Sequence, residues 1–485
     1  MMGHAVWYGI CVWRGDSMPV LAPILRRLSS VTAFLAAIAG HDALAQEQAP
    51  APRAVTLAEA LTYARAHQPE LRAALARVAA QRAEADVPRG QWLPTVGVTG
   101  QIFGATANNT TAGYATLGFM DIPRVGGTRA VSAQTSTLSP YASTFAGVGA
   151  TQELFDFGRI AAQAAAADAL IEVRSHDADA LRLDVDLDVE EAFFAVHAAK
   201  AVLLASDGAF ERSRVHRDLA RAGVQSGLRS PIELTRAEAD LQRFDIGRIR
   251  ARGGVAVAES VLAASIGSPE PALDAAGTMP APAEMPALAS AMQRASTRDP
   301  RVLEALARMK AQEEQTKAVG AELRPDLSLT GTLSGRAGGA PPSSGDRADL
   351  SGLLPSVPNW DVGLVLSWPL FDGTIDARRA ASRSQEQVRR EEIDVARQSL
   401  VATIQQAYVQ VDVARAALPG LQRAVDAAIA NYAQADARFK AGLGTSVELA
   451  DAEALRVSTE IDLAMGTFDL AKTRAAFGRA IAEGL

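Results

Sequence analysis

The hydrophobic pattern divides the chain into long helical stretches and four short strands. Apolar residues three or four positions apart predict amphipathic helices, whereas alternation of apolar and polar residues predicts a strand with one apolar face. Val96 and Val98 begin one alternating run, and Val362 and Leu364 begin another. Strands are expected at residues 96–103, 143–155, 327–333 and 362–368. Residues 105–140 and 336–358 are rich in turn-forming residues and are predicted to be long loops within the two strand pairs.

The second half of the chain repeats the first. Pro300 and Pro325 follow Pro69 and Pro94 at one constant spacing, and the strands keep the same register. Such repetition indicates two copies of one helix–strand–strand–helix unit rather than several unrelated domains. The predicted division is a signal peptide with a possible N-terminal extension at 1–45, a flexible lead at 46–55, a first repeat at 56–267, a Pro-rich linker at 268–287 and a second repeat at 288–485.

Residues 181–189 have an ambiguous pattern. Leucines and valines there alternate with aspartates and an arginine, which locally favours a strand. The surrounding run from residue 159 to 207 contains no Gly or Pro and is much longer than a typical strand. We therefore predict a helix whose two apolar stripes pack between two neighbours.

Particular residues mark where the helices begin and break. Thr56 with Glu59 three residues later predicts a capping box. Pro69 is expected to divide the first helix into two segments, because proline lacks the N–H that the helix needs. Pro419 with Gly420 is expected to kink or break the long helix of the second repeat.

Two similar turns join long helices. Gly227-Leu228 begins one turn and Gly442-Leu443 begins the other, and in both copies Glu-Leu and Ala-Glu-Ala follow at the same positions. Glycine ends helices, and the Ser or Thr residues that follow can cap new ones. The helix before each turn spans roughly 65 residues, or about 100 Å. Each repeat is therefore a long hairpin with one continuous and one composite leg.

Four strands are too few to close a barrel. An open sheet with an apolar outer face has unpaired edges, and lipid cannot satisfy their backbone groups. The barrel must therefore be shared between chains, and three chains would supply an even number of twelve strands.

The N-terminal region has the features of an export signal. Arg26 and Arg27 precede an apolar run at residues 28–40, and Ala43-Leu44-Ala45 matches a cleavage site. Cleavage is expected after Ala45, and an N-terminal membrane anchor is the alternative. No other stretch approaches the roughly 20 apolar residues of a transmembrane helix.

Composition excludes several classes of function. The chain has 485 residues and a formal net charge of −7, without the basic runs of a nucleic-acid-binding protein. Its single cysteine, Cys11, can form neither an internal disulfide nor a cysteine-based metal site. Asp156-Phe157-Gly158 matches a kinase motif, but the other kinase motifs are missing. We expect no catalytic activity, no cofactor and no metal site.

These features together resemble the TolC family of outer-membrane efflux proteins, also called outer-membrane factors. The resemblance runs from residue 56 to the end and rests on the duplicated unit, the paired Gly-Leu turns and the strand exits Leu154-Phe155-Asp156 and Leu370-Phe371-Asp372. It implies a homotrimer with a twelve-stranded barrel in outer-membrane lipid and a long α-helical tunnel in the periplasm. It also implies that the tunnel tip meets a periplasmic adaptor and an inner-membrane pump.

The resemblance also implies roles for residues at the turns. Glu448 and Asp451 occupy the positions of the family's acidic ring, and Glu233 occupies that of a carboxylate that holds the gate closed. Gly444 stands where close relatives carry a gate-bridging arginine. We hypothesise that Arg229 replaces this arginine by reaching Glu448 or Asp451 of a neighbouring hairpin.

Each proposed site has a simpler structural interpretation. Glu448 and Asp451 share one helix face, and the helix dipole stabilises any carboxylate in a first turn. The tip residues Gly227, Leu228, Gly442 and Leu443 either contact the adaptor or only close the helix ends. Trp92, Trp360 and Trp368 flank the strands and form either an interfacial girdle or a packed junction between barrel and tunnel.

The predicted function is that of a passive exit duct driven by a partner pump, for small molecules or for secreted proteins. A periplasmic coiled-coil adaptor or scaffold without a pore is the alternative, although such a protein has no need of four lipid-compatible strands. Opening is expected to move the second hairpin, residues 438–451, outward while the first stays nearly still.

Overall fold

The computed structural model describes residues 52–105, 141–279, 285–337 and 357–483. The predicted signal peptide and most of both predicted loops lie outside the described residues. So do Cys11 and the first part of the predicted lead.

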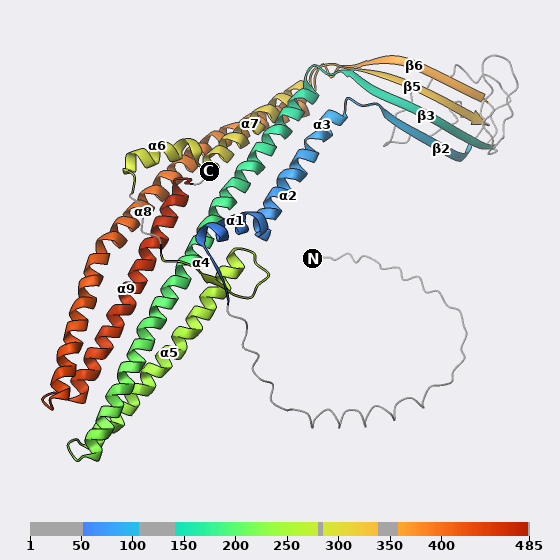
Figure 1. Ribbon diagram of the computed structural model, residues 1–485. Helices are drawn as coiled ribbons and strands as arrows, with labels where there is room; N and C mark the ends of the chain where they lie inside the picture. The colour runs from blue at the N-terminus through green and yellow to red at the C-terminus, as the bar shows by residue number, and fades with distance from the viewer. Residues whose placement is uncertain (1–51, 106–140, 280–284, 338–356, 484–485) are drawn as a thin grey trace, which may run out of the picture. The chain divides into compact units, whose positions relative to one another are not determined.

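The order of elements occurs twice, which confirms the duplicated helix–strand–strand–helix unit (Figure 1). The first copy contains α1 (Leu57–His67), α2 (Pro69–Glu84), α3 (Asp86–Gly90), β2 (Thr95–Ala105), β3 (Tyr141–Phe155), α4 (Arg159–Gln225) and α5 (Pro231–Ser265). The second copy contains α6 (Leu288–Arg298), α7 (Pro300–Ala321), β5 (Asp326–Ala337), β6 (Val357–Ser367), α8 (Gly373–Lys440) and α9 (Ser446–Ala480).

Prolines and caps produce the composite legs. The predicted capping box is present, because the Glu59 N–H donates to Thr56 Oγ1 at 3.3 Å and the Thr56 N–H donates to Glu59 Oε2 at 2.9 Å. Pro69 and Pro300 each stand at the first position of a new helix, where the missing N–H costs nothing. Asp299 caps the second of these helices by accepting from two backbone N–H groups at 3.0 Å.

The continuous legs are the 67-residue α4 and the 68-residue α8. Residues 181–189 are helical, as predicted, and Leu183, Val185 and Val189 among them are buried. Pro419 lies inside α8 without ending it, so the prediction of a possible break there is wrong. One proline removes one backbone hydrogen bond from a long helix that packs along α9, and the remaining turns hold it together.

Helix α4 is the one described helix that is long and apolar enough to cross a membrane, judged by length and composition. The sequence analysis expected no such helix beyond the N-terminal region. The same helix packs against α2, α5, α7 and α9. Part of its apolar surface is therefore buried between helices.

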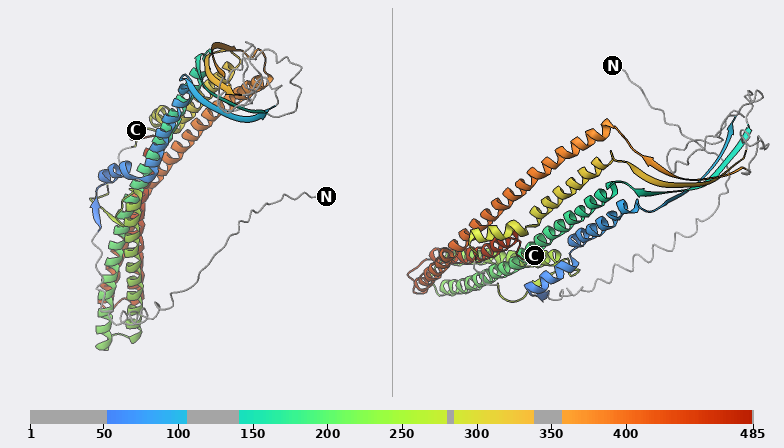
Figure 2. Two further views of the ribbon diagram at one scale, coloured as in Figure 1. Left: turned by 90° about the vertical axis from the view of Figure 1, so that its right-hand side faces the viewer. Right: turned by 90° about the horizontal axis from the view of Figure 1, so that it is seen from above.

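Four antiparallel strands form one sheet in the order β2-β3-β5-β6 (Figures 1 and 2). The register places Val98, Val148, Leu333 and Trp360 in one row across all four strands. All four of these side chains are exposed. The row belongs to a continuous apolar face, which also includes Val96, Leu329, Val362, Leu364 and Leu366.

A second, parallel sheet pairs β1 (Arg53–Val55) with β4 (Leu273–Ala275). The sequence analysis assigned these residues to the flexible lead and the Pro-rich linker. The strands form because Val55 and Leu273 are buried in the core beside Phe193 of α4, at 6% and 2% exposure. The pairing therefore joins the segment before the first repeat to the segment that follows it.

The repeated Leu-Phe-Asp motifs connect strands to helices. Asp156 accepts hydrogen bonds from the backbone N–H groups of Gly158 and Ile160 at the start of α4. Asp372 accepts from the N–H of Thr374 at 2.7 Å at the start of α8. The aspartate thus satisfies N–H groups that have no partner within the helix.

Replacing Asp156 with Ala is expected to lower the free energy of unfolding by about 1–2 kcal/mol, because two helix-start N–H groups lose a buried acceptor. Urea unfolding of the purified protein, followed by circular dichroism, measures the loss. Asp156→Asn keeps one acceptor oxygen and should lose less. Asp372 caps α8 at a more exposed position. If Asp372→Ala lowered the free energy of unfolding as much as Asp156→Ala, burial of the acceptor would not explain the loss at Asp156.

Candidate functional site

The two predicted turns have the same backbone geometry. Gly227 and Gly442 both have φ of 73°, a left-handed conformation that favours glycine. The N–H groups of Leu228 and Leu443 close the ends of α4 and α8 by donating to carbonyls five residues earlier, at 2.9 Å in both cases. The leucine side chains are 84% and 75% exposed, so both tips present apolar residues to solvent.

Glu448 has a structural role at the second turn. It forms a capping box with Thr445, whose Oγ1 accepts from the Glu448 N–H at 3.2 Å. Its carboxylate also lies 4.0 Å from the Arg438 guanidinium, and about half of the side chain is exposed. Asp451 lies one turn further along α9 and is exposed. The proposed ring role of both carboxylates stays a prediction.

Arg229 joins the first turn to the second hairpin. Its Nη1 donates to Glu233 Oε2 at 2.7 Å, and its Nη2 donates to the Phe439 carbonyl at 2.7 Å. The guanidinium also lies 3.6 Å from the centre of the Phe439 ring. Within the chain, Arg229 therefore contacts Phe439 rather than Glu448 or Asp451, since the last carbonyls of α8 carry the negative end of the helix dipole.

Gly444 stands in a crowded position. A Cβ atom there would lie 3.1 Å from the Phe439 nitrogen and 3.2 Å from both Arg438 Cβ and Glu448 Oε2. A larger side chain at this position would therefore require neighbouring atoms of the turn to shift.

Phe439 is a central residue that the sequence analysis missed. It is fully buried in the last turn of α8 and contacts Arg229 on one side. Its ring meets the His216 ring of α4 edge-on, with centroids 4.6 Å apart. No local motif marks this phenylalanine, because its partners lie more than 200 positions away in the sequence.

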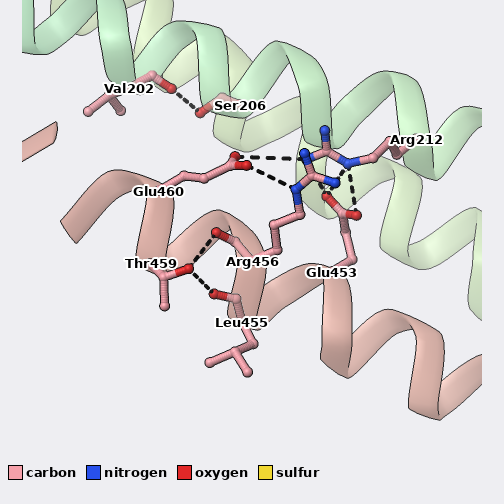
Figure 3. A network of polar contacts seen from close by, with 8 residues as sticks. All are labelled: Val202, Ser206, Arg212, Glu453, Leu455, Arg456, Thr459 and Glu460. Atoms are coloured by element: carbon pink, nitrogen blue, oxygen red, sulfur yellow. Dashed lines mark hydrogen bonds and ion pairs between the residues drawn. The ribbon is translucent and has the colours of Figure 1, made fainter. Parts of the chain in front are cut away.

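A partly buried network of charged side chains joins the two hairpins further from the tips (Figure 3). Arg212 of α4 binds Glu453 of α9 in a bidentate pair, with Nε–Oε2 and Nη2–Oε1 distances of 3.0 and 2.8 Å. Glu460 of α9 lies 3.9 Å from Arg212 and accepts from Arg456 at 2.9 Å. These contacts fix α9 against α4, and sequence analysis did not anticipate them.

Burial sets the titration behaviour of this network. It raises the pKa of the Glu453 carboxyl, and Arg212 and Arg456 offset part of that change. Burial also raises the pKa of the neighbouring Tyr432 on α8 to about 12. The tyrosine ring lies near both guanidinium groups, 5.8 Å from that of Arg212 and 5.4 Å from that of Arg456.

The predicted tryptophans lie at both ends of the sheet. Trp92 lies between α3 and β2, and Trp368 follows the last residue of β6. Trp360 lies near the other end of β6 and is 74% exposed. Leu370 and Phe371, which were singled out in the sequence only as part of a strand exit, are 79% and 84% exposed beside Trp368.

The described part of the chain contains no group of three or more His, Cys, Asp or Glu side chains that could hold a metal ion.

The fold is similar to those of solved outer-membrane channels. It matches the outer-membrane channel OprN with a TM-score of 0.67 and 20% identity, covering 88% of this chain and 90% of OprN. It matches the Campylobacter jejuni CmeC outer membrane channel with a TM-score of 0.70 and 16% identity, covering 88% and 86%. It matches the open state of the Neisseria gonorrhoeae MtrE outer membrane channel with a TM-score of 0.67 and 20% identity, covering 88% and 89%.

Two curated proteins are similar in sequence. Fusaric acid resistance protein FusA of Burkholderia cepacia is 29% identical over 201 residues, which are 41% of this chain and 36% of FusA. The match therefore spans about a third of that relative. Protein CyaE of Bordetella pertussis is 27% identical over 405 residues, which are 82% of this chain and 78% of CyaE.

The family model described as outer membrane efflux protein matches residues 60–268 and 291–483, one segment for each structural repeat. The two segments together cover most of the sequence and confirm the resemblance on which the site residues were chosen. The chain belongs to the outer membrane efflux protein family.

Proposed function

We propose that three copies of this chain form a passive exit channel through the outer membrane. In this proposal an inner-membrane pump supplies the energy and a periplasmic adaptor joins the pump to the tunnel tip. The observation that carries the proposal is an apolar-faced sheet with two free edges, joined to helical hairpins about 100 Å long. A coiled-coil adaptor without a pore has no use for such a sheet.

The free edges support a trimer. Within the described strands, β2 and β6 each pair on one side only. The helices also have free outer faces. Helices α4 and α9 lie in the middle, and α5 and α8 each pack against a neighbour on one side. Exposed apolar residues follow both outer helices, including Ile249 and Val257 on α5 and Val395 and Val409 on α8. A neighbouring copy would cover the helices and extend the sheet at once.

The tryptophans support a position in the membrane. Trp360 and Trp368 are separated by about 26 Å along β6, given about 3.3 Å per residue. This separation is close to the apolar band of about 25 Å in outer-membrane barrels. Trp92, Leu370 and Phe371 would then lie with Trp368 at the periplasmic interface.

The purified protein is expected to be a trimer, because the edges of β2 and β6 need partners from other copies. Native mass measurement in mild detergent should give three chains per particle. A stable monomer recovered from membranes would contradict the shared barrel.

The acidic residues at the second turn are proposed to set ion preference. Three copies of Glu448 and Asp451 around a narrow opening would attract cations, and salt would screen them beyond about 10 Å at 0.1 M.

Replacing Glu448 with Gln together with Asp451 with Asn should lower the cation-to-anion permeability ratio in planar bilayers. Glutamine also serves in a capping box, so the double variant removes charge while preserving the helix start. Glu59→Gln makes the same change in the matching capping box of α1 and should leave permeability unchanged. Equal selectivity in the double variant and the wild type would show that these carboxylates only begin the helix.

Arg229 is proposed to hold the resting gate closed. Its hydrogen bond to the Phe439 carbonyl and its stacking on the Phe439 ring tie the first turn to the end of α8, and its pair with Glu233 holds the guanidinium in place. The buried Arg212–Glu453 pair resists separation further up, so the outward movement of residues 438–451 would pivot there.

Arg229→Ala is expected to raise resting conductance in bilayers, because loss of its contacts removes about 2 kcal/mol per subunit from the closed state. Arg248 on α5 is a matched control, since it stacks on Phe210 at 3.8 Å and pairs with Asp245 at 2.6 Å. Arg248→Ala should conduct like the wild type. If Arg229→Ala behaved like Arg248→Ala, the gate would be held elsewhere.

The exported substrate is proposed to be a small molecule or a secreted protein. The similarity to a protein named for fusaric acid resistance supports the former. Export of small molecules predicts that cells lacking the protein grow more poorly than wild-type cells when toxic compounds are added, and equally well without them.

A further inference from the structure

His216 occupies an unusual place beside the gate contacts. It lies on α4 about three helical turns before Gly227, and only 8% of the residue is exposed. Its Nε2 is buried without a hydrogen-bond partner among the described residues. The hydroxyl oxygen of Ser213, one turn earlier, is buried in the same way. Both residues line a narrow cavity of only about 10 Å³ between α4, α5, α8 and α9.

Charged and titratable groups surround this ring on every element packed against it. They are Arg212 on α4, Arg229 in the first turn, Glu233 and Asp240 on α5, Tyr432 and Asp436 on α8, and Glu453 on α9. Each acidic side chain of this group has a basic partner: Arg212 pairs with Glu453 and Arg229 with Glu233, while Arg243 pairs with Asp240 and Lys440 with Asp436. The ring is therefore held in a nearly neutral, poorly hydrated site.

This site disfavours a charged imidazole while the gate contacts are in place. Burial is the main cause that lowers the pKa of His216, and the Arg229 charge acts in the same direction. Asp240, Asp436 and Glu233 oppose the change without cancelling it. His216 is consequently neutral at neutral pH when the chain has this conformation.

The proposed opening movement would take Phe439 away from His216. Phe439 closes the site from α8, and Arg229 holds Phe439 through its carbonyl and its ring. Movement of the end of α8 away from α4 would expose the imidazole to water. We propose that His216 is a proton-sensitive element of the gate, so that acidification favours separation of α8 from α4 at the tip. This inference rests on the proposed channel function.

The direction follows from linkage. An exposed imidazole has a pKa of about 6.5, whereas the covered imidazole has a lower one. Well above pH 6.5, neither state binds a proton, and the preference for the closed state is complete. As pH falls below that value, the open state gains protons and the preference is lost. At pH 5.5 the opening equilibrium gains at most about tenfold per subunit.

The test compares wild type and His216→Gln in planar bilayers at pH 7.5 and pH 5.5. Open probability of the wild-type channel is expected to rise severalfold on acidification, and His216→Gln should show no such rise. His197→Gln is the matched control, because His197 lies on the same helix with a buried, unpartnered Nε2 and an edge-on Phe193 neighbour. It should retain the wild-type response.

A second measurement reports tip movement directly. Spin labels on cysteines at positions 228 and 443, both exposed, should move apart at pH 5.5 in wild-type background and stay unchanged in His216→Gln. A pH response that survives in His216→Gln, or a variant that is open at both pH values, would overturn the proposal. A protein whose tips respond to pH but which never conducts would instead contradict the proposed channel.

Discussion

Hydrogen bonding at the outer edges of the four-stranded sheet is the constraint on which the rest of the molecule depends. A backbone N–H or C=O that faces hydrocarbon without a partner costs several kcal/mol. Strands β2 and β6 each leave one edge free within the described sheet, and the face between them is apolar. The proposed shared barrel would satisfy both edges, and each of the two repeats contributes two strands and one long helical hairpin.

The regular elements were predictable because their signals are local. The Thr56–Glu59 capping box, the helix breaks at Pro69 and Pro300 and the glycine turns each depend on a few adjacent residues. Run length correctly outweighed local alternation at residues 181–189. The alternative of a break at Pro419 was wrong, because α8 continues through it while packing along α9. The strands β1 and β4 were not predicted, because burial in the core orders them.

The contacts of the candidate site could not be predicted in the same way. The turns were recognisable as a repeated motif, yet the partners of Arg229, Arg212 and His216 lie on a different hairpin. Nothing in the neighbourhood of Phe439 indicates that it will be fully buried and contacted by two of these residues. The crowding around Gly444 could not be predicted either, because it depends on how closely the turn approaches Arg438 and Glu448.

The two sets of contacts between the hairpins differ in how readily they can separate. The Arg212–Glu453 pair is bidentate, and the glutamate side chain is only 5% exposed, so pulling the partners apart would leave charges in a poorly hydrated site. At the tips, the leucines are exposed and the turn backbone satisfies its own hydrogen bonds. Arg229, Phe439 and His216 lie between these regions. The proposed opening movement would leave the upper pair intact and break the contacts of these three residues. In that proposal they supply most of the resistance to opening.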